Sequence, residues 1–338
     1  MAEMEMQDSF EKKYDRVLIW YVTKSCNFSC YQCAGQAKKS ENGTVPEKIN
    51  LPALKTFLAS SKEILRFSFT GGEPFIVENI IAAMKEITER HYVSVITNLV
   101  SPRIKLFSEQ VDPKKVSFIT ASAHMTEMKK RNLLDTFVSN CLLLNEKGFK
   151  LFISEVAYPY MANKAEEYVS YFKKYGLELE FMAFRGKWKG KNYPEDYTKQ
   201  EIEIFNLNKS MHTRNDIFNW KGKPCNAGYN LAVVMDDGYV QPCFSIYQKL
   251  GNIYNGFQFN EYLIKCPFKY CPCPFPVFEN YLYDKALEET GRYNIKNKGI
   301  FFIRVSRALY SFINKITVLP FNLLYNKYND RQEKEMKQ

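Results

Sequence analysis

Six short apolar runs alternate with helical segments between residue 17 and about residue 184. The expected strands are 17–23, 66–70, 92–98, 115–121, 149–157 and 178–184, and the expected helices include 51–61, 78–90, 133–147 and 164–175. Successive strand–helix units are joined by right-handed crossovers into a parallel sheet, and six of them close most of a barrel. The pattern therefore predicts an α/β fold, a partial (β/α)6 TIM-type barrel.

Three cysteines follow the first expected strand with the spacing C-x3-C-x2-C, at Cys26, Cys30 and Cys33. Three thiolates are one fewer than a closed tetrahedral zinc site or a four-thiolate cluster requires. A [4Fe–4S] cluster held by three thiolates keeps one iron open, so another molecule can bind there. The alternatives are a structural zinc site and an incidental group of thiols.

The second expected strand runs directly into the four-residue loop Gly71-Gly72-Glu73-Pro74. Two glycines without Cβ atoms let the backbone approach a ligand closely. Glu73 offers an acceptor for an ammonium group, and Pro74 stiffens the end of the loop.

Together, the cysteine spacing and the Gly-Gly-Glu-Pro loop resemble the radical S-adenosylmethionine (SAM) superfamily. In that family SAM chelates the open iron, and its reductive cleavage yields a 5′-deoxyadenosyl radical. The resemblance implies a SAM-binding [4Fe–4S] cluster on Cys26, Cys30 and Cys33, and a partial (β/α)6 barrel that places both motifs at strand ends. The family usually has an aromatic residue just before the third cysteine. Here Gln32 occupies that position and Tyr31 precedes it, so Gln32 is a candidate contact for the cofactor.

Other polar residues stand where the later strands are expected to end, and in parallel barrels ligands bind at those carboxyl ends. They are Asn98, Ser122, His124, Glu155 and Arg185. By resemblance, Ser122 is the candidate for the SAM ribose and Asn98 is a further cofactor contact. The alternative for each is a polar residue that caps a strand, and His124 in particular is expected to be structural.

A second group of five cysteines lies between Cys225 and Cys273. An Asp236-Asp237-Gly238 turn between two short strands predicts a hairpin that folds Cys243 back beside Cys225. The pattern resembles the SPASM/twitch extensions of radical SAM enzymes and implies one auxiliary [4Fe–4S] cluster. Its expected ligands are Cys225, Cys243 and two of Cys266, Cys271 and Cys273. A structural zinc ribbon is the alternative.

Four segments are expected along the chain. Residues 1–14 are a leader, 15–215 the core barrel, 216–285 the cysteine-rich domain and 286–338 a basic helical tail. Within the tail, 299–328 predicts an amphipathic helix with a narrow basic face. Such a helix either packs on the barrel or lies in the plane of a membrane surface, where it would bring the protein to a lipid-linked substrate.

Charge and cysteine content bear on partners and compartment. The net charge is +10, but residues 291–338 alone hold ten Lys and Arg against three Asp and Glu. Most of the positive charge therefore lies in the tail, and we expect no basic surface for nucleic acid on the main body. Nine cysteines without a secretory signal indicate a reducing compartment. We therefore expect a cytoplasmic protein, with peripheral attachment at the inner face of the membrane if the tail lies on lipid.

The resemblance implies an oxidoreductase-like enzyme that abstracts hydrogen from a small-molecule, glycan-type or lipid-linked substrate. Flavodoxin or ferredoxin would supply electrons, and the auxiliary cluster would assist in oxidising or rearranging the substrate. No peptide-recognition domain is expected before the first strand, which favours such substrates over peptides. A peptide-modifying maturase is the alternative, followed by a non-catalytic iron–sulfur or zinc-binding protein.

Overall fold

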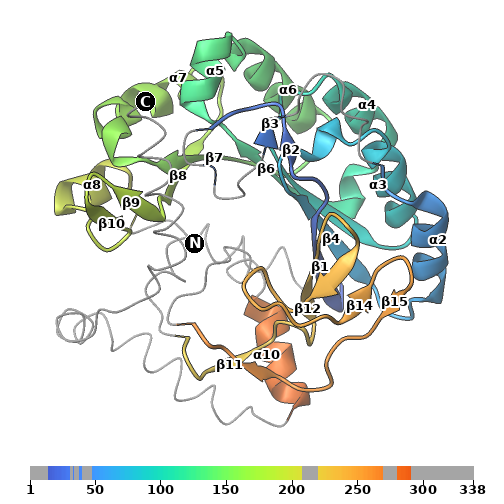
Figure 1. The fold of residues 1–338 in the computed structure, drawn as a ribbon. Coiled ribbons are helices and arrows are strands. Elements are labelled where there is room, and N and C mark those ends of the chain that lie inside the picture. Colours follow the sequence, from blue (N-terminus) through green and yellow to red (C-terminus); the bar gives the residue numbers. More distant parts are fainter. Residues whose placement is uncertain are drawn as a thin grey trace.

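The computed structural model describes residues 14–30, 33, 38–39, 48–207, 220–268 and 280–290. Its main feature is one ten-stranded sheet in the order β15-β14-β13-β12-β1-β4-β5-β6-β7-β8. The sheet curves into an open arc with helices along its outer side (Figure 1). This is the partial barrel that the sequence predicts.

The six predicted strands are all present, neighbouring and parallel. They are β1 (Arg16–Tyr21), β4 (Leu65–Thr70), β5 (Tyr92–Thr97), β6 (Val116–Ser122), β7 (Leu151–Ala157) and β8 (Leu179–Ala183). Because consecutive strands are parallel neighbours, their carboxyl ends meet along one edge of the sheet.

The crossover helices of the barrel include four that the sequence predicts. These are α2 (Leu51–Ser60), α3 (Ile80–Thr88), α6 (Leu134–Glu146) and α7 (Ala165–Lys173). The structure adds α4 (Arg103–Gln110) and α5 (Met125–Arg131) to these. A further helix, α8 (Lys199–Ile204), begins with a capping box between Thr198 and Glu201.

The predicted hairpin is present as β12 (Leu231–Val234) and β13 (Tyr239–Gln241), but it does not stand apart from the barrel. Strand β12 pairs in parallel with β1, where Val17 lies opposite Leu231 and Trp20 opposite Val234. The sheet then continues antiparallel through β13, β14 (Gly251–Asn252) and β15 (Gly256–Phe257). The hairpin is therefore the seventh parallel strand of the barrel sheet and its antiparallel edge.

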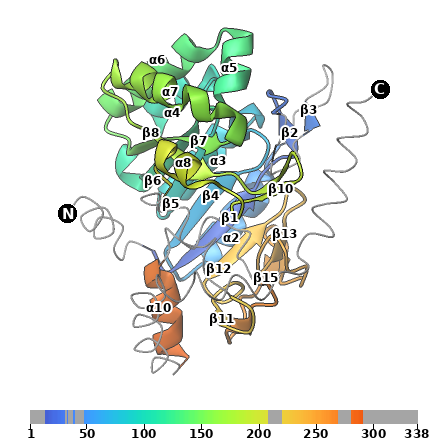
Figure 2. The same cartoon turned by 90° about the vertical axis from the view of Figure 1, so that its left-hand side faces the viewer.

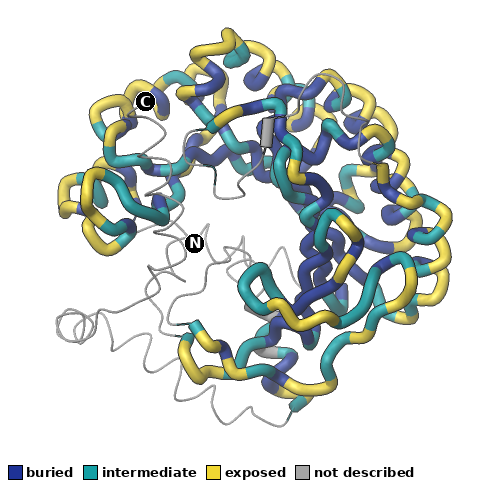
Figure 3. Tube along the Cα trace, in the orientation of Figure 1, coloured by how far each residue is buried: buried dark blue, intermediate teal, exposed yellow. Residues whose placement is uncertain are grey.

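Strand β1 is buried on both faces, as expected for the middle of a covered parallel sheet (Figure 3). Leu18 and Trp20 belong to the main core with the helices, and the Trp20 ring stacks on Phe69 at 5.6 Å. Val17 and Ile19 point to the other face and pack with Leu282 of α10 (Asn280–Glu289). Because the side chains of β1 alternate between the two faces of the sheet, this strand packs both in the main core and against a helix more than 250 residues away in the chain.

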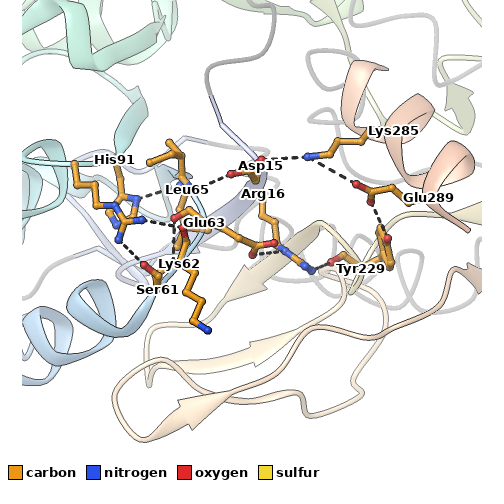
Figure 4. A network of polar contacts seen from close by, with 12 residues as sticks. Asp15, Arg16, Ser61, Lys62, Glu63, Leu65, His91, Tyr229, Lys285 and Glu289 are labelled. Carbon is orange, nitrogen blue, oxygen red and sulfur yellow. Dashed lines mark hydrogen bonds and ion pairs between the residues drawn. The ribbon is translucent and has the colours of Figure 1, made fainter.

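A polar network ties α10 to the amino end of β1 (Figure 4). Lys285 Nζ lies 3.1 Å from Asp15 Oδ1, and Asp15 Oδ2 accepts a hydrogen bond of 2.9 Å from the Ile64 backbone N–H. The Tyr229 hydroxyl donates to Glu289 at 2.7 Å. Figure 2 shows α10 at the end of the sheet away from β2 (Ser25–Cys26) and β3 (Lys38–Lys39). The domain boundary predicted at residue 285 falls within this helix.

Buried His91 provides a pH-dependent element of stability at this amino end. Its Nδ1 accepts a hydrogen bond of 3.1 Å from the Leu65 N–H, and burial, with the nearby Arg90 charge, lowers its pKa to about 4. Between about pH 6.5 and pH 4 the unfolded chain therefore binds a proton that the folded chain does not, so this residue's contribution to stability falls as the pH falls.

We predict that a His91→Gln variant is less stable than the wild type at pH 7.5, and that the difference narrows by about 1–2 kcal/mol at pH 5. Urea denaturation of the iron-free proteins at the two pH values measures this. Glu73, Glu155 and His124 are also buried and titratable, but they are the same in both proteins. Their contribution to the pH dependence of stability therefore cancels when the two proteins are compared. A difference that stays constant with pH would contradict the prediction.

Several predicted features lie outside the described residues. They are Gln32, Cys271, Cys273, the leader up to residue 13 and the tail from residue 291. Among the helices that the structure describes, none has the length and apolar character needed to cross a bilayer.

Candidate functional site

The cysteine loop and the Gly-Gly-Glu-Pro loop lie against each other at the carboxyl edge of the sheet. Strand pairing between β1 and β4 continues past the strand ends, where the Val22 N–H donates to Thr70 O at 2.9 Å. The Gly72 N–H then donates to Thr23 O at 2.7 Å, and the Glu73 N–H donates to Ser25 O at 2.9 Å. The two motifs, 38 residues apart between Cys33 and Gly71, are thus joined backbone to backbone.

Gly71 and Gly72 are required by this contact between the loops. A Cβ on Gly72 would lie 1.8 Å from Ser25 O, and a Cβ on Gly71 would lie 2.5 Å from Thr23 O. Gly71 also has φ +138°, which side chains rarely permit. The sequence predicts that the missing Cβ atoms let the backbone approach a ligand. In the structure they also admit the backbone of the cysteine loop, and the ligand contact stays a prediction.

Glu73 is buried, with 1% of its surface exposed, and its carboxylate accepts hydrogen bonds from protein donors. Oε1 accepts from the Phe75 N–H at 3.0 Å and from Thr97 Oγ1 at 2.8 Å, and Oε2 accepts from the Asn98 N–H at 2.7 Å. Burial raises its pKa to about 7, against the lowering effect of these bonds. Glu73 therefore cross-links the ends of β4 and β5, and its contact with an ammonium group stays a prediction.

Asn98 follows β5 and reaches the cysteine loop directly. Its Nδ2 donates to Asn27 Oδ1 at 2.7 Å, and Asn27 lies immediately after Cys26. A third contact comes from α5, where Arg131 Nη1 donates to Asn27 O at 2.8 Å and Nε forms an ion pair with Glu127 at 3.0 Å. Asn27 and Arg131 were not predicted as site residues, because their roles depend on contacts across 71 and 104 residues of sequence.

The three predicted cysteine ligands lie near one another in this loop. Burial raises the pKa of Cys26 to about 11, and the neighbouring charges of Glu73 and Cys33 act in the same direction. Burial likewise raises the pKa of Cys30, with further contributions from Cys33 and Cys26. Cys26 and Cys30 are thus neutral thiols when no metal is bound, and metal ligation must release their protons.

The remaining predicted strand-end residues lie along the same edge. Ser122 is half-buried at the end of β6, opposite Ser154 of β7. Glu155 is buried, with a pKa raised to about 7 by burial, and it accepts hydrogen bonds from the Met125 and Val156 N–H groups at 2.6 Å and 2.7 Å. Burial lowers the pKa of His124 to about 4, and its ring packs edge-on to Phe28 at 5.9 Å.

A row of aromatic rings starts at Tyr158, just after the end of β7, and the sequence does not predict it. Burial raises the pKa of Tyr158, and the charges of Glu155, Cys30 and Cys33 contribute. The Tyr158 ring stacks on Tyr160 at 5.4 Å, and Tyr160 packs against Trp188 at 5.3 Å. Trp188 ends β9 (Gly186–Trp188), which pairs with β10 (Lys191–Tyr193).

The second cysteine group is gathered by a pairing that the sequence did not predict. Strand β11 (Pro224–Cys225) pairs with β16 (Ile264–Lys265), which places Cys225 opposite Ile264, and the Cys266 N–H donates to Lys223 O at 2.9 Å. Burial raises the pKa of Cys243, and part of the effect comes from the charge of Cys266. Of the late group, Cys266 lies within the described residues, and the structure places it near the other two. The assignments of metal ligands stay predictions.

Within the described ranges, no three His, Cys, Asp or Glu side chains are gathered in a group that could hold a metal ion as they stand. The donor set of the front loop nevertheless fits a cluster chemically, because Cys26, Cys30 and Cys33 are three thiols on one loop and thiolates are the ligands of iron–sulfur clusters. A cavity of about 510 Å³ lies at the opposite end of β1, beside the Arg16–Glu63 ion pair of 2.6 Å, and no cysteine lines it. The candidate site is thus the carboxyl edge.

Comparison with solved structures identifies the fold. Histidine-tagged anSMEcpe with bound AdoMet aligns over 71% of this chain and 75% of its own, with a TM-score of 0.52 and 19% identity. Native anSMEcpe with bound AdoMet and Kp18Cys peptide aligns over 81% of this chain and 98% of its own, with a TM-score of 0.52 and 16% identity. The chain has the fold of a radical SAM enzyme.

The radical SAM fold is the one predicted from the cysteine spacing and the Gly-Gly-Glu-Pro loop, and the prediction is confirmed. Streptococcus suis SuiB bound to S-adenosylmethionine and BtrN in complex with AdoMet and 2-DOIA superpose less closely, with TM-scores of 0.48 and 0.36, so the assignment rests on anSMEcpe. No protein-family model and no curated protein sequence matches the chain.

Proposed function

We propose that this protein is a radical SAM enzyme that binds a [4Fe–4S] cluster and SAM at the carboxyl edge of its barrel. The observation that supports this is the direct hydrogen bonding of the three-cysteine loop to the Gly-Gly-Glu-Pro loop. Two sequence motifs of one family meet there, within a fold that anSMEcpe shares with AdoMet bound. Cys26, Cys30 and Cys33 would hold the cluster, and SAM would lie against Gly71–Pro74 and Ser122.

When bound, the cluster would supply the electron that cleaves SAM to methionine and a 5′-deoxyadenosyl radical. This chain's own residues position the parts. The buried Glu73 fixes the glycine loop to β5, and Asn98 and Arg131 fix the cysteine loop. Flavodoxin or ferredoxin is proposed as the electron donor.

The test is anaerobic reconstitution with iron and sulfide, followed by reduction in the presence of SAM. We expect bound iron and the release of 5′-deoxyadenosine and methionine in equal amounts. Zinc in place of iron, or no SAM cleavage after reduction, would favour the alternative of a non-catalytic metal-binding protein.

We propose that the substrate is a small molecule or a glycan-type or lipid-linked compound that loses a hydrogen atom from carbon. The packed aromatic rings of Tyr158, Tyr160 and Trp188 follow the carboxyl end of β7 and support a ring-bearing substrate on that side of the site. Aromatic side chains offer large, rigid contact surfaces of this kind.

A peptide substrate is the second candidate. It is favoured by the alignment with peptide-bound anSMEcpe, which extends over 98% of that chain. Deuterium transfer separates the two proposals: candidate substrates deuterated at carbon are incubated with enzyme and SAM, and label is sought in 5′-deoxyadenosine. Label from peptides alone would overturn the first proposal.

We propose that Cys225, Cys243, Cys266 and either Cys271 or Cys273 hold one auxiliary [4Fe–4S] cluster. The pairing of β11 with β16 supports this set, because Cys225 lies opposite Ile264 and Cys266 follows two residues later, bonded to Lys223 O. The auxiliary cluster would accept an electron from the substrate or bind the substrate. A structural zinc ion is the alternative for the same thiols.

We predict that Cys243→Ala lowers the iron content from about eight to about four atoms per chain, because one of two four-iron clusters loses a ligand. SAM cleavage without substrate is expected to continue, since Cys26, Cys30 and Cys33 are untouched. Iron analysis and the 5′-deoxyadenosine assay measure the two results. Unchanged iron with loss of zinc would instead support a zinc site.

We also propose a cytoplasmic location with peripheral membrane attachment through residues 299–328. The support is the sequence pattern alone, which predicts an apolar and aromatic helix with a narrow basic face. Deleting residues 296–338 should abolish co-sedimentation with anionic liposomes and leave SAM cleavage intact. Equal liposome binding by both proteins would exclude this role.

A further inference from the structure

Asn27 is held by neighbouring elements through both its side chain and its backbone. The Asn98 amide donates to Asn27 Oδ1 at 2.7 Å, and the Arg131 guanidinium donates to Asn27 O at 2.8 Å. The Arg131 guanidinium also lies over the Phe28 ring at 5.3 Å. The segment between the first two cysteines is therefore attached to the ends of β5 and α5.

Asn98 is itself fixed in place. It is 3% exposed, its N–H donates to Glu73 Oε2 at 2.7 Å, and its Oδ1 accepts from the Val100 N–H at 3.3 Å. The next residue, Leu99, has φ +57°, a left-handed conformation that costs a non-glycine residue free energy. The Thr97 hydroxyl supports this kink, because it accepts from the Leu99 N–H at 2.9 Å.

These bonds close a ring. Glu73 donates its N–H to Ser25 O, and its carboxylate accepts from Asn98, which donates to Asn27, two residues from Ser25. The Gly-Gly-Glu-Pro loop therefore contacts the cysteine loop twice, once through its backbone and once through Asn98. Two separate attachments restrict sliding and rotation of one loop over the other.

Two neighbours approach the side-chain oxygen of Asn27. The Asn98 amide donates to Asn27 Oδ1 at 2.7 Å, and Cys26 Sγ lies 3.8 Å from the same oxygen. A thiol is a weak donor, so the Asn98 amide is the stronger of the two described attachments of this side chain.

We propose that Asn98 is a positioning residue, which acts through Asn27 to fix the three-cysteine loop against the Gly-Gly-Glu-Pro loop. This differs from the direct cofactor contact expected from the sequence, because both polar atoms of the Asn98 side chain already have protein partners. The effect on SAM rests on the proposed function, whereas the effect on the loop does not.

The test is a double-mutant cycle with Asn98→Ala, Asn27→Ala and the double variant. Asn140→Ala is the matched control, because Asn140 Nδ2 donates to Leu99 O at 2.8 Å and so loses a similar bond at the same turn without touching the cysteine loop. Asn27→Ala leaves the kink at Leu99 intact and keeps the test valid if Asn98→Ala folds poorly.

The first measurement is hydrogen–deuterium exchange of the iron-free proteins, over peptides that contain residues 24–30. We expect faster exchange in both single variants, no further increase in the double variant, and wild-type exchange in Asn140→Ala. The inference would be overturned if the increases in exchange of the two single variants added up in the double variant. It would also be overturned if exchange in Asn140→Ala were as fast as in Asn98→Ala.

The second measurement is made on reconstituted protein. Each single variant should raise the KM for SAM about tenfold, and the double variant should raise it no further. The EPR signal of the reduced cluster with SAM should change equally in the three variants and not in the control. A raised KM in Asn98→Ala but not in Asn27→Ala would instead indicate a direct contact between Asn98 and SAM.

The two measurements separate two kinds of failure. If the wild type neither holds iron nor cleaves SAM, the proposed function fails, while the exchange experiment still tests whether Asn98 positions the loop. If the wild type cleaves SAM but the cycle is additive, only the positioning role is overturned.

Discussion

Replacing Cys26 with alanine is expected to reduce SAM cleavage to background and to remove about four iron atoms per chain. Cys26 is a buried thiol next to the Asn27 contact, and with Cys30 and Cys33 it makes up the full thiol set of the front loop. Two remaining thiols cannot hold a cluster in the proposed way. Iron analysis and 5′-deoxyadenosine release after anaerobic reconstitution measure both effects.

Cys141 provides the matched control for this prediction. It is fully buried in α6, and burial raises its pKa as it does for Cys26, but it stands outside both cysteine groups. Cys141→Ala should lower the unfolding free energy by about 1 kcal/mol through the lost sulfur contacts and leave iron content unchanged. Full SAM cleavage by Cys26→Ala would contradict the proposed ligand set.

Replacing Gly72 with alanine is expected to lower SAM cleavage and iron retention at least about tenfold while the barrel still folds. The added Cβ would lie 1.8 Å from Ser25 O and 2.4 Å from Ser25 C, so one loop has to move. Movement breaks the bond of 2.9 Å from Glu73 N–H to Ser25 O and separates the cysteine loop from the glycine loop. Loss of one such bond and the strain of the contact account for an effect of this size.

Gly148→Ala separates this effect from the general cost of replacing a glycine. Gly148 has φ +81°, and a Cβ added there would meet no atom within 4 Å, so alanine costs about 1 kcal/mol of backbone strain without a clash. We expect that variant to melt earlier but to bind iron and cleave SAM like the wild type. Circular dichroism melting and iron analysis on both variants measure this, and normal iron binding by Gly72→Ala would refute the role of the close contact.

The barrel strands could be predicted because each carries its own signal. Strands such as 66–70 and 92–98 are short apolar runs between helical segments, and β4 and β5 agree with them to within a residue at each end. Helix α4 was harder to predict, because Arg103–Gln110 places only a few buried side chains among charged residues. Its position between β5 and β6 completes the crossover that the parallel pairing requires.

The relation of the hairpin to the barrel could not be predicted from local pattern. Leu231–Val234 is recognisable as a strand, but its partner β1 lies more than 200 residues earlier in the chain. Pairing between distant strands depends on which edge of the sheet remains open after the other strands have paired. For the same reason, local pattern could not predict the pairing of β11 with β16, which brings Cys266 into the second cysteine group.

In the site, the structure shows protein partners that the sequence does not predict. Gly72 and Glu73 join loops and strand ends, and the ligand contact that the sequence predicts for them stays a prediction. Glycine and a carboxylate allow close backbone approach and hydrogen bonding to any partner, so spacing does not reveal which partner they meet.

The sequence by itself determined the family resemblance, the six parallel strands and the two groups of cysteines. These depend on residue identity and spacing over short distances, where chain connectivity limits the possible arrangements. Only the tertiary structure decided that Asn98 and Arg131 donate hydrogen bonds to Asn27 and that Glu73 is a buried cross-link. It also decided that the hairpin extends the barrel sheet. Those contacts join residues tens to hundreds of positions apart, and they form because parallel packing brings the carboxyl ends of all the strands to one edge.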